Sequence, residues 1–172
     1  MTIILGIDPG SQITGFGLID AQKHSLVHLH HGYIRVAQLP MVERLQQIFL
    51  SLTEIIRRYT PQEAAIEQVF MHANPGAALT LGQARGAAMT AVGYADLGLA
   101  EYTARQVKQS LVGYGAANKV QMQAMICHLL NLVETPQVDA ADALAIAVCH
   151  AHHRSGLAAM IGQRGRRRGR SR

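Results

Sequence analysis

The chain has 172 residues, of which 49% are apolar, and a formal net charge of +5. This length and apolar content fit one folded domain with a substantial core and exclude an intrinsically disordered chain. Seven arginines and no acid follow residue 153, so residues 1–153 carry a net charge of −2. The sequence therefore predicts a folded domain over residues 1–155 and a disordered, Arg- and Gly-rich basic tail over residues 156–172.

No segment directs the chain to a membrane or to an oxidising compartment. No apolar run reaches bilayer-spanning length, and the first apolar run lacks the basic segment of a signal peptide. Cys127 and Cys149 lie in apolar helical patterns and are expected as buried free thiols. The adjacent His128 and His150 would permit zinc binding, but no short Cys-x-x-Cys pair anchors it, and we expect His150 at a solvated helix end. The prediction is a cytoplasmic protein without membrane contact.

The first 36 residues predict three strands. Residues 3–7 indicate a buried central strand, residues 14–19 a strand that returns antiparallel to it, and residues 25–36 a third strand. Asp8 ends the first strand, just before the turn residues Pro9 and Gly10. A carboxylate there is costly to bury unless a cation or hydrogen bonds meet it. Asp8 is therefore either a site residue or the cap of a turn.

A crossover helix and two further strands follow. Residues 41–59 carry one apolar stripe and predict a helix that leads to a fourth strand over residues 63–68. Glu67 interrupts the apolar pattern of that strand. Residues 75–95 predict a helix rich in glycine, which costs about 1 kcal/mol relative to alanine in a helix. We expect this helix to approach either the sheet or a twin helix in a dimer. Residues 99–103 predict the fifth strand.

Three helices complete the pattern, over residues 105–112, 119–132 and 139–153. Asp139 and Asp142 open the last one and share a face, although acids in a first turn also complement the helix dipole. With Asp8 and Glu67 they make a set of hard oxygen ligands suited to Mg²⁺ or Mn²⁺. Two such ions about 4 Å apart can activate a water and stabilise the leaving oxygen of a phosphodiester.

Together these elements predict an α/β domain with a five-stranded mixed sheet and helices on both faces. The first three strands are antiparallel, and helical crossovers then deliver parallel ones. In that arrangement Asp8 and Glu67 end neighbouring strands and meet the first turn of the helix that carries Asp139 and Asp142.

Five motifs resemble those of the RuvC family of Holliday-junction resolvases and span residues 3 to about 150. They are Gly6-Ile-Asp8-Pro-Gly10-Ser, Ala65-Ile-Glu67-Gln-Val-Phe70, Leu81-Gly-Gln-Ala-Arg85-Gly, Ala104-Arg-Gln-Val-Lys108-Gln and Asp139-Ala-Ala-Asp142-Ala-Leu-Ala. The resemblance implies a ribonuclease-H-like, Mg²⁺-dependent endonuclease that resolves four-way DNA junctions by paired, symmetric nicks in recombination and repair. It implies two Mg²⁺ ions per site, with Mn²⁺ as a substitute, a homodimer, and the branch-migration proteins RuvA and RuvB as partners.

The resemblance also assigns single residues. It places the acidic tetrad on Asp8, Glu67, Asp139 and Asp142.

Further residues would contact DNA. Phe70 either covers the edge of the core or, by resemblance, stacks on bases opened at the junction centre, an interaction worth ~1–3 kcal/mol. Lys108 and Lys119 would lie beside the cleaved strand and stabilise developing charge, although solvation or phosphate contact explains such lysines equally well. Arg85 and Arg105 are predicted as phosphate contacts.

Three other functions stay open. Residues 6–17 also resemble the phosphate-gripping hairpin of actin-like ATPases and sugar kinases, although 172 residues cannot supply the two domains of those enzymes. A ribonuclease H acting on RNA–DNA hybrids would share the fold and the metal chemistry. A catalytically silent junction-binding module is the third, and the four intact acids argue against it.

Overall fold

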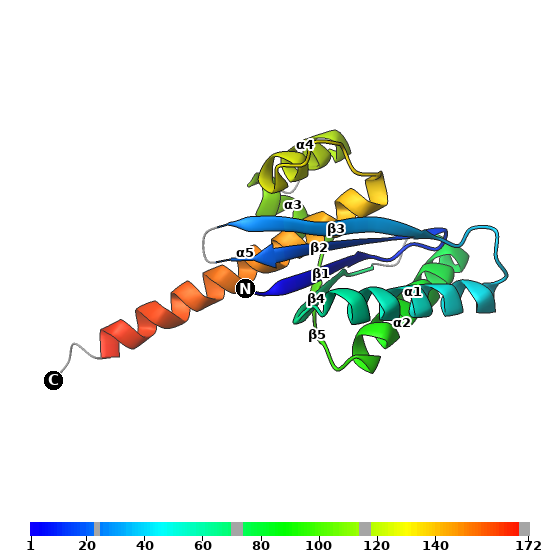
Figure 1. Ribbon diagram of the computed structural model, residues 1–172, viewed down its shortest axis with the longest axis horizontal. Coiled ribbons are helices and arrows are strands. Elements are labelled where there is room, and N and C mark those ends of the chain that lie inside the picture. The colour runs from blue at the N-terminus through cyan, green and yellow to red at the C-terminus, as the bar shows by residue number, and fades with distance from the viewer. Residues whose placement is uncertain (23–24, 70–73, 114–117, 169–172) are drawn as a thin grey trace.

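The computed structural model describes residues 1–22, 25–69, 74–113 and 118–168, with side-chain detail up to residue 156. Its centre is a five-stranded sheet of order β3-β2-β1-β4-β5 (Figure 1). The strands are β1 (Ile3–Asp8), β2 (Ile13–Ala21), β3 (Leu26–Arg35), β4 (Glu63–Glu67) and β5 (Gly98–Tyr102). The first three are antiparallel neighbours, whereas β4 is parallel to both β1 and β5. The predicted mixed sheet is confirmed.

Helices cover both faces of this sheet. On one side lie α1 (Met41–Tyr59) and α2 (Pro75–Tyr94), and on the other α3 (Ala104–Val112), α4 (Lys119–Leu130) and α5 (Val138–Arg168). The side chains of Asn74, Thr103 and Asn118 accept hydrogen bonds from the first turns of α2, α3 and α4. Such caps contribute about 1 kcal/mol each. Within the described residues, no helix combines the length and apolarity needed to cross a bilayer.

Alternation along the strands decides which residues face which helices. In β1, Leu5 and Ile7 pack in the cluster under α1 and α2, whereas Ile4 and Gly6 face α5. Ala65 of β4 likewise packs against α5. Because side chains two residues apart point to the same face, the last residues of β1 and β4, Asp8 and Glu67, also face α5.

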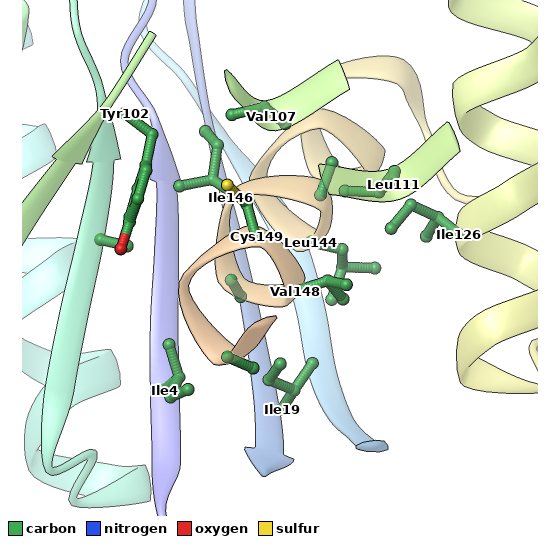
Figure 2. Close-up of a cluster of buried hydrophobic side chains, with 14 of the residues drawn as sticks. Ile4, Ile19, Tyr102, Val107, Leu111, Ile126, Leu144, Ile146, Val148 and Cys149 are labelled. Atoms are coloured by element: carbon green, nitrogen blue, oxygen red, sulfur yellow. The ribbon is translucent and has the colours of Figure 1, made fainter. Parts of the chain in front are cut away.

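The core on that face is built around α5. Figure 2 shows its apolar side chains between the sheet and the helices α3 and α4; the labelled residues include Ile4, Ile19, Val107, Leu111, Ile126, Leu144, Ile146 and Val148. Burying one such side chain stabilises the fold by about 1.5–3 kcal/mol. Lys108 lies on α3, and Lys119 is the first residue of α4. Both helices therefore pack in the same apolar cluster as α5, the helix that carries the two aspartates.

Three glycines, Gly6, Gly15 and Gly17, form a bare patch on which α5 rests; we call it the glycine patch. Gly6 pairs with Gly17, and Gly15 lies opposite the last residue of β1. A Cβ at Gly15 would stand 2.0 Å from the carbonyl oxygen of Asp139, and one at Gly6 would stand 2.1 Å from that of Ala143. Any side chain there would collide with the helix backbone, so these glycines bring the start of α5 down to the ends of the strands.

Two expectations about α5 differ from the structure. The sequence predicts that this helix ends at residue 153, whereas its backbone continues to Arg168. Leu157, Ala158, Ala159 and Met160 are strong helix formers, which favours continuation of the helix beyond residue 156. The boundary between a nuclease domain and a tail stays a prediction.

His150 is also placed differently. Rather than pointing to solvent, its ring contacts the hydroxyl of Tyr102 (2.8 Å) and a carboxylate oxygen of Glu63 (2.7 Å). Its side chain is only 13% exposed. The helical period alone could not show that two neighbouring strands bring partners to this histidine.

The glycine patch generates the first prediction. Gly6→Ala should destabilise the protein by about 1–3 kcal/mol, because the added methyl overpacks a main-chain contact. Thermal unfolding followed by circular dichroism measures the change. Gly98→Ala is the matched control, since a Cβ at that position meets nothing within 4 Å. Equal melting temperatures for the two variants would contradict the close contact between α5 and the sheet.

Candidate active site

Three carboxylates from distant parts of the sequence line one cavity. Asp8 ends β1, Glu67 ends the neighbouring parallel strand β4, and Asp142 lies in the second turn of α5. The cavity has a volume of about 330 Å³. It is also lined by Lys108 of α3 and by Lys119, the first residue of α4. The remaining lining residues are Ala104, Val107, Met122, Ala145 and Ile146. The structure thus brings together five of the predicted site residues.

Asp139, the fourth predicted acid, lies one turn before Asp142 but does not line the cavity. The side-chain amide of Gln137 donates a hydrogen bond to its carboxylate, and the Gln137 oxygen accepts one from the backbone of Ala140 at 3.2 Å. Its charge still reaches the site, because it raises the pKa of both Asp8 and Asp142. Asp139 therefore adds negative potential at the cavity edge.

Burial and mutual repulsion perturb the carboxyl groups. Burial, followed by the charges of Glu67 and Asp142, raises the pKa of Asp8 well above its usual range. Burial and then Asp142 raise the pKa of Glu67, and a hydrogen bond with Asp8 partly opposes this shift. Burial also raises the pKa of Asp142, against the attraction of Lys119. Protonation thus relieves the crowding of negative charge, which is also what a bound cation does.

Two lysines supply positive charge to the same cavity, Lys108 and Lys119. The Nζ of Lys119 lies 4.0 Å from Oδ2 of Asp142, and its side chain is 75% exposed. An exposed pair of this kind contributes little to stability. Lys108 and Lys119 both lower the pKa of Glu67. Both lysines therefore add positive potential to the cavity that the carboxylates line.

The donor set fits a divalent metal by its chemistry. Carboxylate oxygens are the ligands of Mg²⁺ and Mn²⁺, and crowded acids with raised pKa values bind a cation in exchange for protons. Within the described ranges, no three His, Cys, Asp or Glu side chains already form a set of metal ligands. Asp8, Glu67 and Asp142 are the side chains that would hold the ion.

Of the other predicted residues, Arg85 and Arg105 do not line this cavity. Arg105 is exposed on α3, one turn before Lys108. Arg85 lies on α2, and its guanidinium pairs with Glu101. Phe70 lies outside the described residues, directly after the segment that ends at 69.

A five-stranded mixed sheet of this order, with acids at the ends of two parallel neighbours and on a helix packed against them, defines a ribonuclease-H-like nuclease domain. The family described as "Crossover junction endodeoxyribonuclease RuvC" matches residues 4–150. A protein of that name from Legionella pneumophila (strain Lens) is 51% identical over 100% of this chain and 99% of the relative. Another, from Marinobacter nauticus, is 59% identical over 88% of this chain and 87% of the relative. The chain belongs to the RuvC family of crossover junction endodeoxyribonucleases.

Solved structures agree. "T. thermophilus RuvC in complex with Holliday junction substrate" superposes with a TM-score of 0.85 at 32% identity, over 90% of this chain and 96% of that one. The yeast mitochondrial Holliday junction resolvase Ydc2 is 12% identical, with a TM-score of 0.63 over 87% and 78%, and shows likeness of fold alone. The ribonuclease-H-like fold class predicted from the sequence is confirmed.

The raised pKa of Asp8 predicts how stability depends on pH. Because the folded chain holds this proton more tightly than the unfolded chain, the free energy of unfolding falls as pH rises from about 4 through the raised pKa. In EDTA, Asp8→Asn should therefore melt at a higher temperature than the wild type at neutral pH and show a weaker pH dependence. Adding Mg²⁺ should narrow the difference. The exposed Asp96 offers the control, Asp96→Asn; parallel pH profiles for Asp8→Asn and the wild type would contradict the prediction.

Proposed function

We propose that this chain is a Mg²⁺-dependent endonuclease that resolves four-way DNA junctions by paired, symmetric nicks in two strands. It would act in homologous recombination and DNA repair, in the cytoplasm. The observation that carries the proposal is the convergence of Asp8, Glu67 and Asp142 with two lysines on one cavity, in a chain of the RuvC family. The Holliday junction substrate bound by the T. thermophilus relative supports the choice of DNA structure.

Each group in the cavity has a chemical task in this proposal. The carboxylates of Asp8, Glu67, Asp139 and Asp142 would hold two Mg²⁺ ions, which Mn²⁺ can replace. When bound, the ions supply an activated water and stabilise the leaving oxygen. Lys108 and Lys119 would stabilise the negative charge that develops on the phosphate in the transition state. Because the site is partly buried, these charges act with less screening than in water.

Contacts further along the DNA are also proposed. The exposed Arg105 shares a face of α3 with Lys108, so it would bind a phosphate next to the scissile one. Phe70 would stack on bases opened at the junction centre, as the family resemblance implies. RuvA and RuvB are proposed as partners on the family relationship alone.

The structure also supports a homodimer. A four-way junction has approximate two-fold symmetry, so a C₂ dimer would present one site to each of two strands. Among the described residues, nothing lies within 4 Å of a Cβ built at Gly82, Gly86 or Gly93 of α2, which favours the twin helix over the sheet as the packing partner of these glycines. The exposed Leu79 and Tyr94 flank them. A twin helix on this face of α2 would give the glycines their packing partner.

The substrate is tested by cleavage assays on a four-way junction, an RNA–DNA hybrid and a plain duplex. We expect Mg²⁺-dependent, symmetric nicks in the junction only. Cleavage of the hybrid would favour the ribonuclease H alternative, and junction binding without cleavage would favour a silent binding module.

Substitution of the carboxylates should separate binding from chemistry. Asp8→Asn, Glu67→Gln and Asp142→Asn should each reduce the cleavage rate by at least about 10²-fold, since a lost ligand misplaces the ions. Junction affinity should be preserved or increased, because a negative charge is removed. Gel-shift and single-turnover assays measure the two quantities. Near-normal cleavage by any of these variants would remove that residue from the site, and Asp139→Asn applies the same criterion to the acid at the cavity edge.

Analytical ultracentrifugation tests the dimer. The wild type should sediment as a dimer, and Gly86→Phe as a monomer with an unchanged circular dichroism spectrum, because a Cβ at this position meets nothing within 4 Å in the described part of the chain. Gly98→Phe, on β5, is the control and should stay dimeric. A monomeric wild type would contradict the dimer, and a dimeric Gly86→Phe would contradict the assignment of α2 to its interface.

A further inference from the structure

Arg85 lies across the sheet from the cavity. Its α2 helix covers the face opposite α5, and its partner Glu101 lies on that same face, because Tyr102, the next residue of β5, packs against α5. A guanidinium in this place does not line the cavity with Lys108 and Lys119. The sequence-based interpretation of Arg85 as a phosphate contact has no support from this position.

All three nitrogens of the Arg85 guanidinium are engaged within the chain. Nε donates to the main-chain carbonyl of Glu67 at 3.2 Å, one terminal nitrogen pairs with the carboxylate of Glu101, and the other lies 3.1 Å from the sulfur of Met89. The Arg85 side chain is 19% exposed. A planar guanidinium with fixed donor directions is suited to bind three such partners at once.

The carbonyl that Arg85 binds belongs to a residue whose carboxylate lines the cavity. Glu67 is the last residue of β4, where the regular strand pairing ends. On the β5 side, the backbone N–H of Gln68 donates to the carbonyl of Tyr102 at 2.8 Å. The hydrogen bond from Arg85 of α2 to the Glu67 carbonyl is the second bond that holds this strand end. These two hydrogen bonds hold the backbone of Glu67, whose side chain points to the cavity on the α5 face of the sheet.

We infer that Arg85 is a positioning residue that acts through Glu67, and that Glu101 holds its guanidinium against the Glu67 carbonyl. This inference rests on the proposed function, in which Glu67 is a metal ligand. Groups that orient metal ligands typically affect metal affinity 10- to 100-fold. The pair would therefore set how well the site binds its ions, and α2, the helix proposed to form the dimer interface, would be joined directly to a ligand of the site.

The alternative role, a contact with DNA, predicts the opposite response at Glu101. If Arg85 bound phosphate, removing the Glu101 charge would free the guanidinium and strengthen junction binding. If Arg85 positions Glu67, removing that charge loosens the guanidinium and weakens metal binding without strengthening the junction complex.

The experiment compares Arg85→Gln, Arg85→Lys and Glu101→Gln with Arg105→Gln as the matched control. Calorimetry measures Mn²⁺ binding without DNA, gel shifts in EDTA measure junction affinity at several salt concentrations, and cleavage is followed against metal concentration. We expect Arg85→Gln to bind Mn²⁺ roughly tenfold more weakly or worse, to need correspondingly more metal for half-maximal cleavage, and to keep the wild-type salt slope. Glu101→Gln should shift Mn²⁺ affinity in the same direction by less, and Arg85→Lys should restore part of it.

The control should behave in the reverse way. Arg105→Gln should keep wild-type Mn²⁺ affinity and reduce the slope of log affinity against log salt by about 0.9. Wild-type Mn²⁺ affinity in Arg85→Gln would overturn the inference, whether the variant shows a reduced salt slope or only a lowered melting temperature. Tighter junction binding by Glu101→Gln would overturn it too, and this variant decides the matter if Arg85→Gln does not fold. A wild type that binds Mn²⁺ but does not cut junctions would instead overturn the proposed substrate alone.

Discussion

The close contact between α5 and the glycine patch is the constraint on which the rest of the site depends. A Cβ at Gly15 would lie 2.0 Å from the Asp139 carbonyl oxygen, so the helix begins directly over the strand that pairs with β1. That contact places Asp142 beside Asp8, although 133 residues separate them in the sequence. Side chains at the glycine patch would move α5, and Asp142 with it, away from the sheet that carries Asp8 and Glu67.

The same packing accounts for the balance of charge. Burial and repulsion raise the pKa of Asp8, Glu67 and Asp142, and each of these groups is opposed by at least one lysine. The helices that bring the lysines are held by Val107, Leu111, Met122 and Ile126, which belong to the apolar cluster around α5. One hydrophobic core therefore positions the helices and strands that carry both signs of charge before any ligand arrives.

Much of the fold could be predicted from local signals. The apolar run before Asp8, the stripe of α1 and the interruption at Glu67 each indicate a strand or helix end without tertiary information. Strand alternation then puts Asp8 and Glu67 on one face. The long-range contacts could not be predicted in this way. Nothing near Arg85 in the sequence shows that its guanidinium meets the carbonyl of Glu67 and the side chain of Glu101 behind the sheet.

The glycines illustrate the same limit. Sequence alone marks Gly82 and Gly86 as unusual, because glycine is costly inside a helix, yet only the structure shows that they meet open space. Gly6, Gly15 and Gly17 look like ordinary strand and hairpin residues in the sequence, and only the packed helix reveals that they carry the close contact. His150 shows a related failure, since its partners Glu63 and Tyr102 come from two different strands.

The glycine patch also sets the smallest distance to which α5 can approach the sheet. Main-chain atoms in contact have no rotamers to change, and the repulsion between them rises steeply, so the spacing between β1 and the first turns of α5 is stiff. The lysines differ, because each reaches the cavity on a long side chain with several rotatable bonds. The backbone that carries the acids is therefore held at a fixed spacing, whereas the two lysine side chains can change rotamer. We expect the lysines, rather than the acids, to adjust to the position of a bound DNA strand.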